Sequence, residues 1–459
     1  MAEKYDVVVI GGGPGGYPAA IRAAQLGARV ALVEEDKLGG ECTNYGCIPT
    51  KAIVRPLEAI HRAASLPFTK GSLEVDFKGL MEWVNGITGQ VSGGVETLLK
   101  GYDVEILRGR ARLSGSTTID VDGAKIWADR IVIATGTSPS SIPGVSIDGE
   151  IIHNNRTILG LRRKPGSMLI IGGGYIGVEY ANAMAKLGVE VTIVEMMPRL
   201  LPGMDKDLAR VAQRRLKKLG VQIHTNTMVK ELKASEKGAE ATLSNGGKVE
   251  AEKVLIAVGR RPNTSGIGLE NAGVSLDERG YIKVDENMAT SNPRIYASGD
   301  VAGPPLLAHK AFLQGAVAGE NAAGGEAVYE PRAVPAVVYT EPELASVGYT
   351  LDEAREAGFN AEEKRYPLGG LAMARIEEAT DGMVKLVYNT DSQQLLGVHI
   401  AAPHAGEIIA GLTLALEYGA SLEDLALTIH PHPSIVEAVR EAAELVLGRP
   451  IHYILRRRG

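Results

Sequence analysis

The sequence predicts an α/β fold, on the strength of a repeated pattern and a glycine excess. A strand, a glycine-rich turn, a helix and a second strand follow one another at the start of the chain, and the same order returns further on. Glycine supplies 56 of the 459 residues, about 12% against an average of about 7%. The glycines have no collagen-like period, so we expect them at tight turns and close backbone approaches.

The first copy of the pattern lies directly at the start. Its valine-rich opening run is typical of a buried parallel strand, and Pro14 stands where a helix begins. The parts are, in order, a strand over 5–10, a G-x-G-x-x-G turn (Gly11, Gly13, Gly16) that includes Pro14 and Gly15, a helix over 19–26 that Gly27 ends, and a strand over 29–33 before Glu34.

The second copy follows 161 residues later. One such turn is a weak signal, but two with the same flanking strand, helix and acid indicate two dinucleotide sites. The first glycine permits the turn, the second lets the backbone approach a pyrophosphate, and the third lets the helix pack closely on the strand. The parts are a strand over 168–171, Gly172, Gly174 and Gly177, a helix over 175–187, Gly188, and a strand over 190–194 before Glu195.

The acid after each unit indicates the ligand. A carboxylate there accepts hydrogen bonds from ribose hydroxyls and repels a 2′-phosphate, so Glu195 favours NAD over NADP, although Arg199 lies nearby. The alternative, two glycine-rich turns without a ligand, leaves the matched acids unexplained. Two sites suggest two different dinucleotides that exchange electrons.

The two cysteines of the chain are Cys42 and Cys47. So few exclude a disulfide scaffold. If a helix begins around Asn44, both sulfurs lie near its N-terminus, where the dipole lowers a thiol pKa. We therefore expect a redox-active disulfide, with two buried free thiols as the alternative. No Cys or His pair is spaced to complete a metal site, so we expect none.

A histidine near the C-terminus is the candidate base. Ser434 is a plausible N-cap for an apolar-periodic helix from Ile435 to Leu447, and Glu437 in its first turn could orient an imidazole just before it. A carboxylate-oriented histidine can take a proton from a thiol. His309 is expected to be structural or to lie beside a cofactor.

Charge and hydropathy exclude other classes. The net charge is -6 and no long basic run exists, which argues against nucleic acid. Residues 456–458 are arginines, which we expect to form a solvated tail. No stretch reaches the roughly 20 apolar residues of a membrane span. The chain starts without a signal-like segment, so we expect a cytoplasmic protein with no membrane partner.

Several motifs together resemble the flavoprotein disulfide reductases over the whole chain. The cysteine and histidine motifs are the specific ones. The motifs are residues 11–16 with Glu34, 42–51, 134–139, 172–179, 258–264, 298–300, and 432–434 with Glu437.

The resemblance implies a role for each site residue. Cys42 would meet the substrate, Cys47 would lie against the flavin, and Lys51 would pair with Glu179 beside it. His432 would be the base and Glu437 its orienter, whereas His430 has no acid five residues on. The expected FAD contacts are Gly11, Gly13, Pro14, Gly15, Gly16, Glu34, Gly40, Lys51, Ala111, Thr135, Gly136, Asp300 and Ala308, and the NAD contacts are Gly172, Gly174, Tyr175, Ile176, Gly177, Glu195, Val229 and Gly259.

The resemblance also implies the architecture. We expect two Rossmann-like dinucleotide-binding domains, for FAD over 1–145 and for NAD over 146–268, with 269–332 completing the FAD domain. A C-terminal α+β dimerisation domain over 333–459 would form a homodimer whose active sites are shared across subunits.

Within the family, the resemblance is strongest to members that oxidise protein-bound dihydrolipoyl groups with NAD+. Such a subunit serves 2-oxoacid dehydrogenase or glycine cleavage complexes, so a lipoyl-bearing protein is the expected partner. Glutathione-type reductases carry arginines at the Glu195 position, and mercuric reductases need a further cysteine pair that this chain lacks. A redox-silent flavoprotein scaffold is the rival of another class.

Four positions depart from the family pattern, namely Pro18, Glu41, Thr43 and Tyr45. Glu41 adds negative charge beside the cysteines, which would raise their pKa values. Tyr45 would narrow access for a lipoyl group, and Pro18 would remove one helical N–H. These departures bear on efficiency and substrate more than on reaction type.

Overall fold

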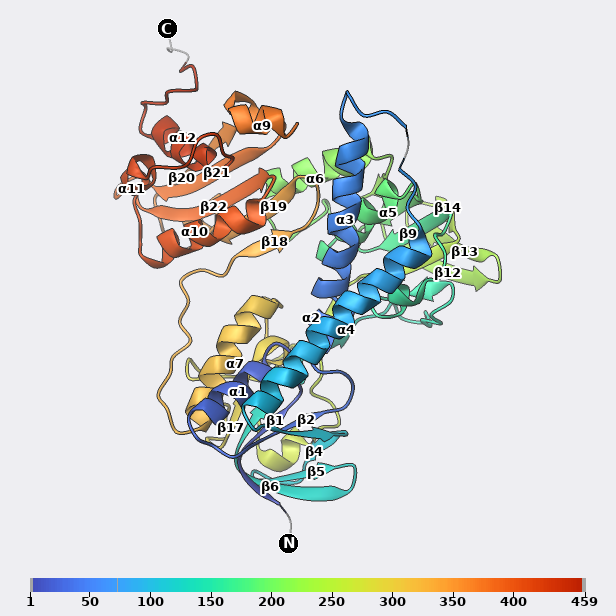
Figure 1. The fold of residues 1–459 in the computed structure, drawn as a ribbon, viewed down its shortest axis with the longest axis vertical. Helices are drawn as coiled ribbons and strands as arrows, with labels where there is room; N and C mark the ends of the chain where they lie inside the picture. Colours follow the sequence, from blue (N-terminus) through green and yellow to red (C-terminus); the bar gives the residue numbers. More distant parts are fainter. Residues whose placement is uncertain (1–2, 72, 456–459) are drawn as a thin grey trace.

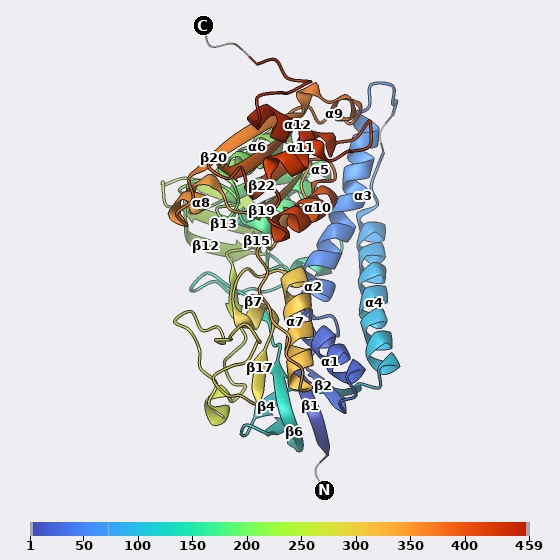
Figure 2. The ribbon, with the colours of Figure 1, turned by 90° about the vertical axis from the view of Figure 1, so that its left-hand side faces the viewer.

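The computed structural model describes residues 3–71 and 73–455 and has three sheet-containing units. In Figures 1 and 2 the N-terminal unit lies at the bottom, and the second (green) and third (orange to red) units lie side by side above it. The α/β fold is confirmed, whereas the domain boundaries stay a prediction. The arginines at 456–458 lie outside the described residues.

The first unit is built on a mainly parallel sheet in the order β3-β2-β1-β6-β5-β4, with β17 beside β6. Every residue from Val7 to Ile10 in β1 is buried, as a central strand covered on both faces requires. The strands are β1 (Lys4–Ile10), β2 (Val30–Glu34), β3 (Glu105–Arg108), β4 (Ala111–Leu113), β5 (Thr118–Val121), β6 (Ala124–Ile133) and β17 (Ile295–Ala297).

Helices α1 (Gly16–Gln25) and α7 (Ala308–Ala322) lie side by side on this sheet (Figure 1). Gly315 and Gly319 permit the close approach, because a Cβ on either would overlap a carbonyl oxygen of α1 or of the turn before it. Pro18 is the third residue of α1. The N–H that Pro18 lacks therefore costs no helical hydrogen bond, because the first four N–H groups of a helix have no partner within it.

The second unit repeats this plan with a parallel sheet in the order β11-β10-β9-β15-β8. Helix α5 starts at Tyr175 and Gly188 follows it with a positive φ of 75°, as the pattern predicts. The elements are β8 (Ile152–His153), β9 (Ser167–Ile171), α5 (Tyr175–Lys186), β10 (Glu190–Val194), α6 (Lys206–Lys218), β11 (Gln222–His224) and β15 (Lys253–Ile256), with an antiparallel sheet of β12 (Val229–Ser235), β13 (Gly238–Leu243) and β14 (Lys248–Ala251).

The third unit is an antiparallel sheet in the order β18-β19-β22-β21-β20 with helices around it. It shares no strand with the sheets of the other two units, in keeping with the expected α+β domain. Its elements are β18 (Ala336–Val338), β19 (Glu343–Gly348), α8 (Leu351–Glu356), β20 (Ala361–Pro367), α9 (Ala372–Ile376), β21 (Met383–Asn389), β22 (Leu395–Ala402), α10 (Ala405–Glu417), α11 (Leu422–Leu427) and α12 (Glu437–Val446).

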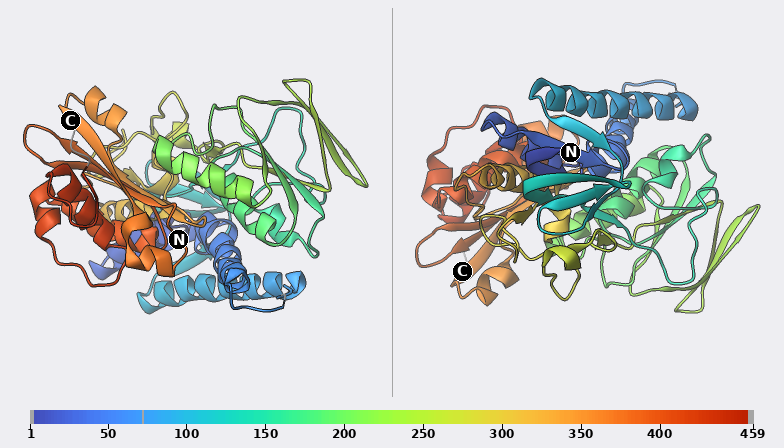
Figure 3. Two further views of the ribbon diagram at one scale, coloured as in Figure 1. Left: turned by 90° about the horizontal axis from the view of Figure 1, so that it is seen from above. Right: turned by 90° about the horizontal axis from the view of Figure 1, so that it is seen from below.

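Three helices of the first unit connect the molecule. They are α2 (Gly40–Tyr45), α3 (Cys47–Ser65) and α4 (Phe77–Gly101). Ile53 and Leu57 of α3 belong to one core cluster with Ile170 of β9 and Leu344 of β19, so α3 is buried against all three units. The end views in Figure 3 show α4 (blue) along one edge of the molecule.

The chain crosses between the first two units at a short ribbon. This ribbon consists of β7 (Thr137–Pro139) and β16 (Arg260–Pro262), which pair in antiparallel fashion. Within the described residues, no helix is both long and apolar enough to cross a membrane.

Candidate active site

A single cleft of about 2010 Å³ joins the two glycine-rich turns. Cavities for one drug-sized ligand reach about 1,000 Å³, so this cleft has room for larger or multiple ligands. Of the expected contacts, it is lined by Gly11, Gly13, Pro14, Gly15, Glu34, Gly40, Lys51, Ala111, Thr135, Gly136, Asp300 and Ala308 of the FAD set and by Gly172, Gly174, Tyr175, Ile176, Glu195, Val229 and Gly259 of the NAD set.

The two units match in hydrogen bonding as well as in sequence. The Gly12 N–H donates to Glu34 Oε2 at 2.6 Å, and the Asp36 N–H donates to Oε1 at 2.8 Å. In the second unit Gly173 and Met197 donate to Glu195 in the same way, at 2.6 and 2.7 Å. Each carboxylate is thus held at the cleft wall with lone pairs left for a ribose.

The third glycine of each turn does not line the cleft. A Cβ on Gly16 would overlap the Gly11 carbonyl oxygen, and a Cβ on Gly177 would overlap that of Gly172. These two glycines let the helix lie close against its strand, as the sequence pattern predicts.

The cleft walls fit two dinucleotides. Gly11 and Gly172 have φ values of +102° and +109°, which few other residues adopt, and no atom lies within 4 Å of a Cβ built on Gly174. The turns therefore leave backbone open where the starts of α1 and α5 attract phosphate. Within the described residues, no cluster of His, Cys, Asp or Glu could hold a metal ion.

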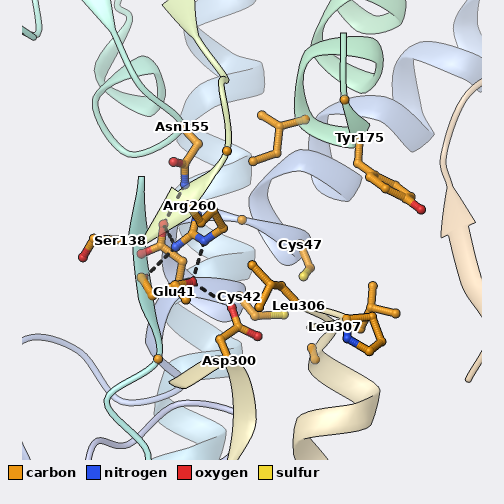
Figure 4. A pocket seen from close by; sticks show the side chains of 18 of the residues that line it. Glu41, Cys42, Cys47, Ser138, Asn155, Tyr175, Arg260, Asp300, Leu306 and Leu307 are labelled. Atoms are coloured by element: carbon orange, nitrogen blue, oxygen red, sulfur yellow. Dashed lines mark hydrogen bonds and ion pairs between the residues drawn. The ribbon is translucent and has the colours of Figure 1, made fainter. Parts of the chain in front are cut away.

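The two cysteines lie on different helices, because the chain breaks at Gly46. Cys42 lies inside α2, and Cys47 is the first residue of α3. The expectation of one helix starting near Asn44 is wrong: Asn44 belongs to α2, and its side-chain amide donates to the Leu38 and Gly40 carbonyls. Only Cys47 therefore lies at the N-terminus of a long helix (Figure 4).

Cys42 and Cys47 are both free and partly buried in the structure. Their hydrogen bond is the main cause that lowers the pKa of Cys47 and raises that of Cys42. Burial raises the pKa of both, and Lys51 lowers it. Cys47 is therefore the sulfur of the pair that ionises first.

Lys51, one turn after Cys47, forms a partly buried ion pair with Glu179 of α5. Its Nζ lies 2.7 Å from Glu179 Oε2 and 3.0 Å from Oε1. The Tyr339 N–H of the third unit donates to the same Oε1 at 2.9 Å, and the Tyr339 ring centroid lies 4.6 Å from Nζ. Residues of all three units therefore hold the Lys51–Glu179 ion pair: Lys51 of the first, Glu179 of the second and Tyr339 of the third.

Tyr339 carried no signal in the sequence, because neither its spacing nor its neighbours mark it as a site residue. Burial tends to lower the pKa of Lys51, but Glu179 and the other neighbours raise it further, so Lys51 stays a cation beside the cysteines. A fixed cation at this place can stabilise negative charge that develops nearby.

His432 lies away from the cleft and on the surface. Its Nδ1 lies 2.9 Å from Glu437 Oε1, and 73% of its side chain is exposed. Burial acts to raise the Glu437 pKa, but the bonds from His432 and the Ser434 N–H hold it below the usual value. Within one chain, the structure therefore does not bring His432 to the cysteines.

The prediction that Ser434 caps the following helix is wrong. Helix α12 starts at Glu437, whose carboxylate accepts the Ser434 N–H at 2.8 Å, and the Ser434 hydroxyl donates back to the Pro431 carbonyl. The loop is thus organised around Glu437. His309 lines the cleft and its Nε2 lies 2.6 Å from the Pro335 carbonyl oxygen, in line with a structural residue beside the cofactor region.

Comparison with known proteins gives one family over most of the chain. Residues 5–315 match the pyridine nucleotide-disulphide oxidoreductases, and residues 334–443 match the dimerisation domain of that family. The dihydrolipoyl dehydrogenase of Thermus scotoductus is 45% identical, covering 99% of this chain and 100% of the relative. That of Geobacillus stearothermophilus is 40% identical, covering 99% and 98%.

Solved structures agree. LpdA from Mycobacterium tuberculosis has a TM-score of 0.89 at 29% identity, covering 97% of this chain and all of that one. The HOCl-induced flavoprotein disulfide reductase RclA from Escherichia coli has a TM-score of 0.86 at 29% identity, covering 96% and 100%.

Proposed function

The chain belongs to the pyridine nucleotide-disulphide oxidoreductase family, and from this premise we propose that it oxidises dihydrolipoyl groups to lipoyl and reduces NAD+ through FAD. The observation that carries the proposal is the cysteine pair beside the Lys51–Glu179 ion pair, in one cleft with both glycine-rich turns. Dihydrolipoyl dehydrogenases 45% and 40% identical to the chain over almost its whole length support the substrate.

FAD would bind at the first turn and NAD at the second. Together they supply two-electron transfer from a dithiol to a nicotinamide. Glu34 and Glu195 would hold the ribose ends, and the starts of α1 and α5 would face the phosphates. Asp300, whose Oδ2 accepts the Thr137 hydroxyl at 2.8 Å, lines the same cleft.

The thiol chemistry starts from the Cys42–Cys47 disulfide. One dihydrolipoyl thiol gives its proton to His432 and attacks the Cys42 sulfur, which breaks the disulfide and frees the Cys47 thiolate. The second substrate thiol then attacks the substrate sulfur of the mixed disulfide. Lipoyl disulfide leaves, and Cys42 and Cys47 hold the two electrons. Lys51 stabilises the Cys47 thiolate next to the flavin side of the cleft.

The base must come from a second subunit. The matched dimerisation domain supports a homodimer, and within one chain His432 is exposed and outside the cleft. We propose that His432 of each subunit serves the cysteines of the other. A lipoyl-bearing protein of a 2-oxoacid dehydrogenase or glycine cleavage complex would be the substrate, and a cytoplasmic location stays a prediction.

Cysteine substitutions in the purified flavoprotein test this function. Cys42→Ser should abolish NAD+ reduction by dihydrolipoamide, because no sulfur remains to meet the substrate, while NADH still reduces the flavin in an anaerobic titration. Cys47→Ser is the matched variant and should lose the long-wavelength absorbance that a thiolate against a flavin gives. If Cys42→Ser keeps most of its lipoamide turnover, the assigned chemistry is wrong.

A further inference from the structure

Glu41, the residue before Cys42, has charged or amide partners on both carboxylate oxygens (Figure 4). Arg156 approaches Oε2 with Nη2 at 2.6 Å and Nε at 2.8 Å. Asn155 donates to Oε1 at 2.8 Å, and Arg260 Nη2 lies 3.1 Å from the same oxygen. The Glu41 side chain, on the helix α2 that also contains Cys42, is therefore the centre of a polar cluster.

The partners of Glu41 come from the segments that connect the two dinucleotide-binding units. Asn155 and Arg156 follow β8, after the chain has entered the second unit, and Arg260 begins β16, where the chain returns. Arg260 also donates to the Thr137 hydroxyl and carbonyl at 2.7 and 2.8 Å. The Glu41 carboxylate thus connects helix α2 to both segments that link the two dinucleotide-binding units.

Two arginines of the cluster face two carboxylates, those of Glu41 and Asp36, the latter 3.7 Å from Arg156 Nη1. Lys37 Nζ also lies 5.4 Å from the centroid of the Tyr45 ring. The Tyr45 hydroxyl donates to Asp36 and its ring stacks under Arg156, so Tyr45 belongs to this cluster. Burial acts to raise the pKa of Glu41, but Arg260, Asn155 and Arg156 lower it further, so the carboxylate is ionised at neutral pH.

We propose that Glu41 is a positioning residue. Its carboxylate lets Arg156 and Arg260 fix, beside Cys42, the two segments that connect the dinucleotide-binding units. The same carboxylate cancels the positive charge of these arginines at the sulfurs of Cys42 and Cys47. This inference rests on the proposed function of the cysteines. The sequence predicts that Glu41 adds negative charge beside the cysteines, and Arg156 and Arg260 face that charge. The other ionisable groups that face the sulfurs are Lys51 of α3, Glu179 of α5 and Tyr17 of α1.

The test compares charge variants in the reduced holoenzyme. Removing the charge with Glu41→Gln leaves a net positive cluster, which favours thiolate. We expect the pH midpoint for alkylation of the reduced cysteine pair by iodoacetamide, followed by mass spectrometry, to fall by about 0.5–1 pH unit. Arg156→Gln makes the cluster more negative and should raise the midpoint. Glu41→Asp keeps the charge and should retain the parental profile.

Asp381→Asn is the control, because Asp381 forms ion pairs with Arg215 and Lys218 between the second and third units, away from the cysteines. It should leave the midpoint unchanged. The inference is overturned if Glu41→Gln matches the parent, if Glu41→Asp shifts the midpoint as much as Glu41→Gln, or if the control shifts it too. If Glu41→Gln does not fold, an unchanged midpoint in Arg156→Gln overturns it. A parent enzyme without dihydrolipoamide turnover refutes the proposed function instead.

Discussion

The third glycine of each glycine-rich turn lies where a side chain would overlap the backbone of its own turn. Gly16 and Gly177 occupy the third positions of the two turns, and a Cβ on either would overlap a carbonyl oxygen of the first glycine. Backbone cannot move aside as a flexible side chain can, so an alanine there must push the helix away from its strand. The two positions are equivalent in geometry and differ in the dinucleotide that each turn would hold.

We therefore expect Gly177→Ala to raise the Kd for NADH about tenfold or more while the protein keeps its flavin, because about 1–3 kcal/mol of strain falls on the second turn. Gly16→Ala should instead lower the flavin content. Isothermal titration and visible absorbance measure the two effects. The control is Gly101→Ala at the end of α4, where no atom lies within 4 Å of the added Cβ. Equal effects of both alanines on NADH binding would contradict the assignment.

At the scale of elements, helix α7 carries a buried lysine against the first sheet. Lys310 is 4% exposed, and its Nζ donates to the Gly303 carbonyl at the end of a short 3-10 helix (Gly299–Ala302). Burial lowers the pKa of Lys310 to about 8, although Asp300 acts in the opposite direction. A folded-state pKa below the ordinary value of 10.5 makes stability depend on pH.

Between about pH 8 and 10.5 the folded chain has released the Lys310 proton while the unfolded chain still holds it. Stability therefore rises with pH in this window, and this contribution is absent below it. We expect the difference in unfolding free energy between the parent and Lys310→Met to change by about 2 kcal/mol in favour of the parent when the pH rises from 7.5 to 10. Urea unfolding measures it. Lys283→Met, at an exposed lysine, is the control, and a constant difference for Lys310→Met would refute the shift.

Local sequence predicted the elements that depend on local chemistry. In both strand–helix–strand repeats, the strands and the helix start and end within three residues of the predicted bounds. The turn glycines, Gly27 and Gly188 set these bounds because they act on their own neighbours. The break at Gly46 and the loop around Glu437 were not predictable in this way. In each case a side chain bonds to backbone outside its own helix: Asn44 donates to the Leu38 carbonyl, and Glu437 accepts the Ser434 N–H.

The candidate site was predictable to the same extent. The motifs contain Cys42, Cys47 and both acids, but nothing near Tyr339 or Arg156 marks them. Tyr339 meets Glu179 across 160 residues of chain, and Arg156 meets Glu41 across 115. Contacts of that range are set by how the three units pack, which no pattern within one segment records.

At the scale of the molecule, the third unit presents apolar side chains at its surface. These side chains are between 59% and 91% exposed: Leu414 in α10, Tyr418 directly after it, Leu427 at the end of α11, and Ile429 beyond it. An apolar surface of this kind is typical of an interface between subunits. It lies in the same unit as His432, which the proposed mechanism places opposite the partner's cysteines.

We expect the double variant Tyr418→Glu with Ile429→Glu to be a monomer by light scattering. Its lipoamide turnover should fall by about 10²–10⁴, the usual contribution of a general base, while NADH still reduces its flavin. Phe68→Glu is the control, because Phe68 is 78% exposed on the α3–α4 connection. A monomer with full lipoamide turnover would show that the active site is complete in one chain.

The position of β17 determines the order in which a newly made chain can fold. Ile295 of β17 pairs with Ile131 of β6, so the whole second unit is synthesised between two neighbouring strands of the first. At roughly 5–20 residues per second, the ribosome needs on the order of ten seconds or more for that insertion. During this time the edge of β6 stays unpaired while the second unit can already close its own sheet. Nicotinamide dinucleotide binding should therefore mature first on the ribosome, and flavin loading last.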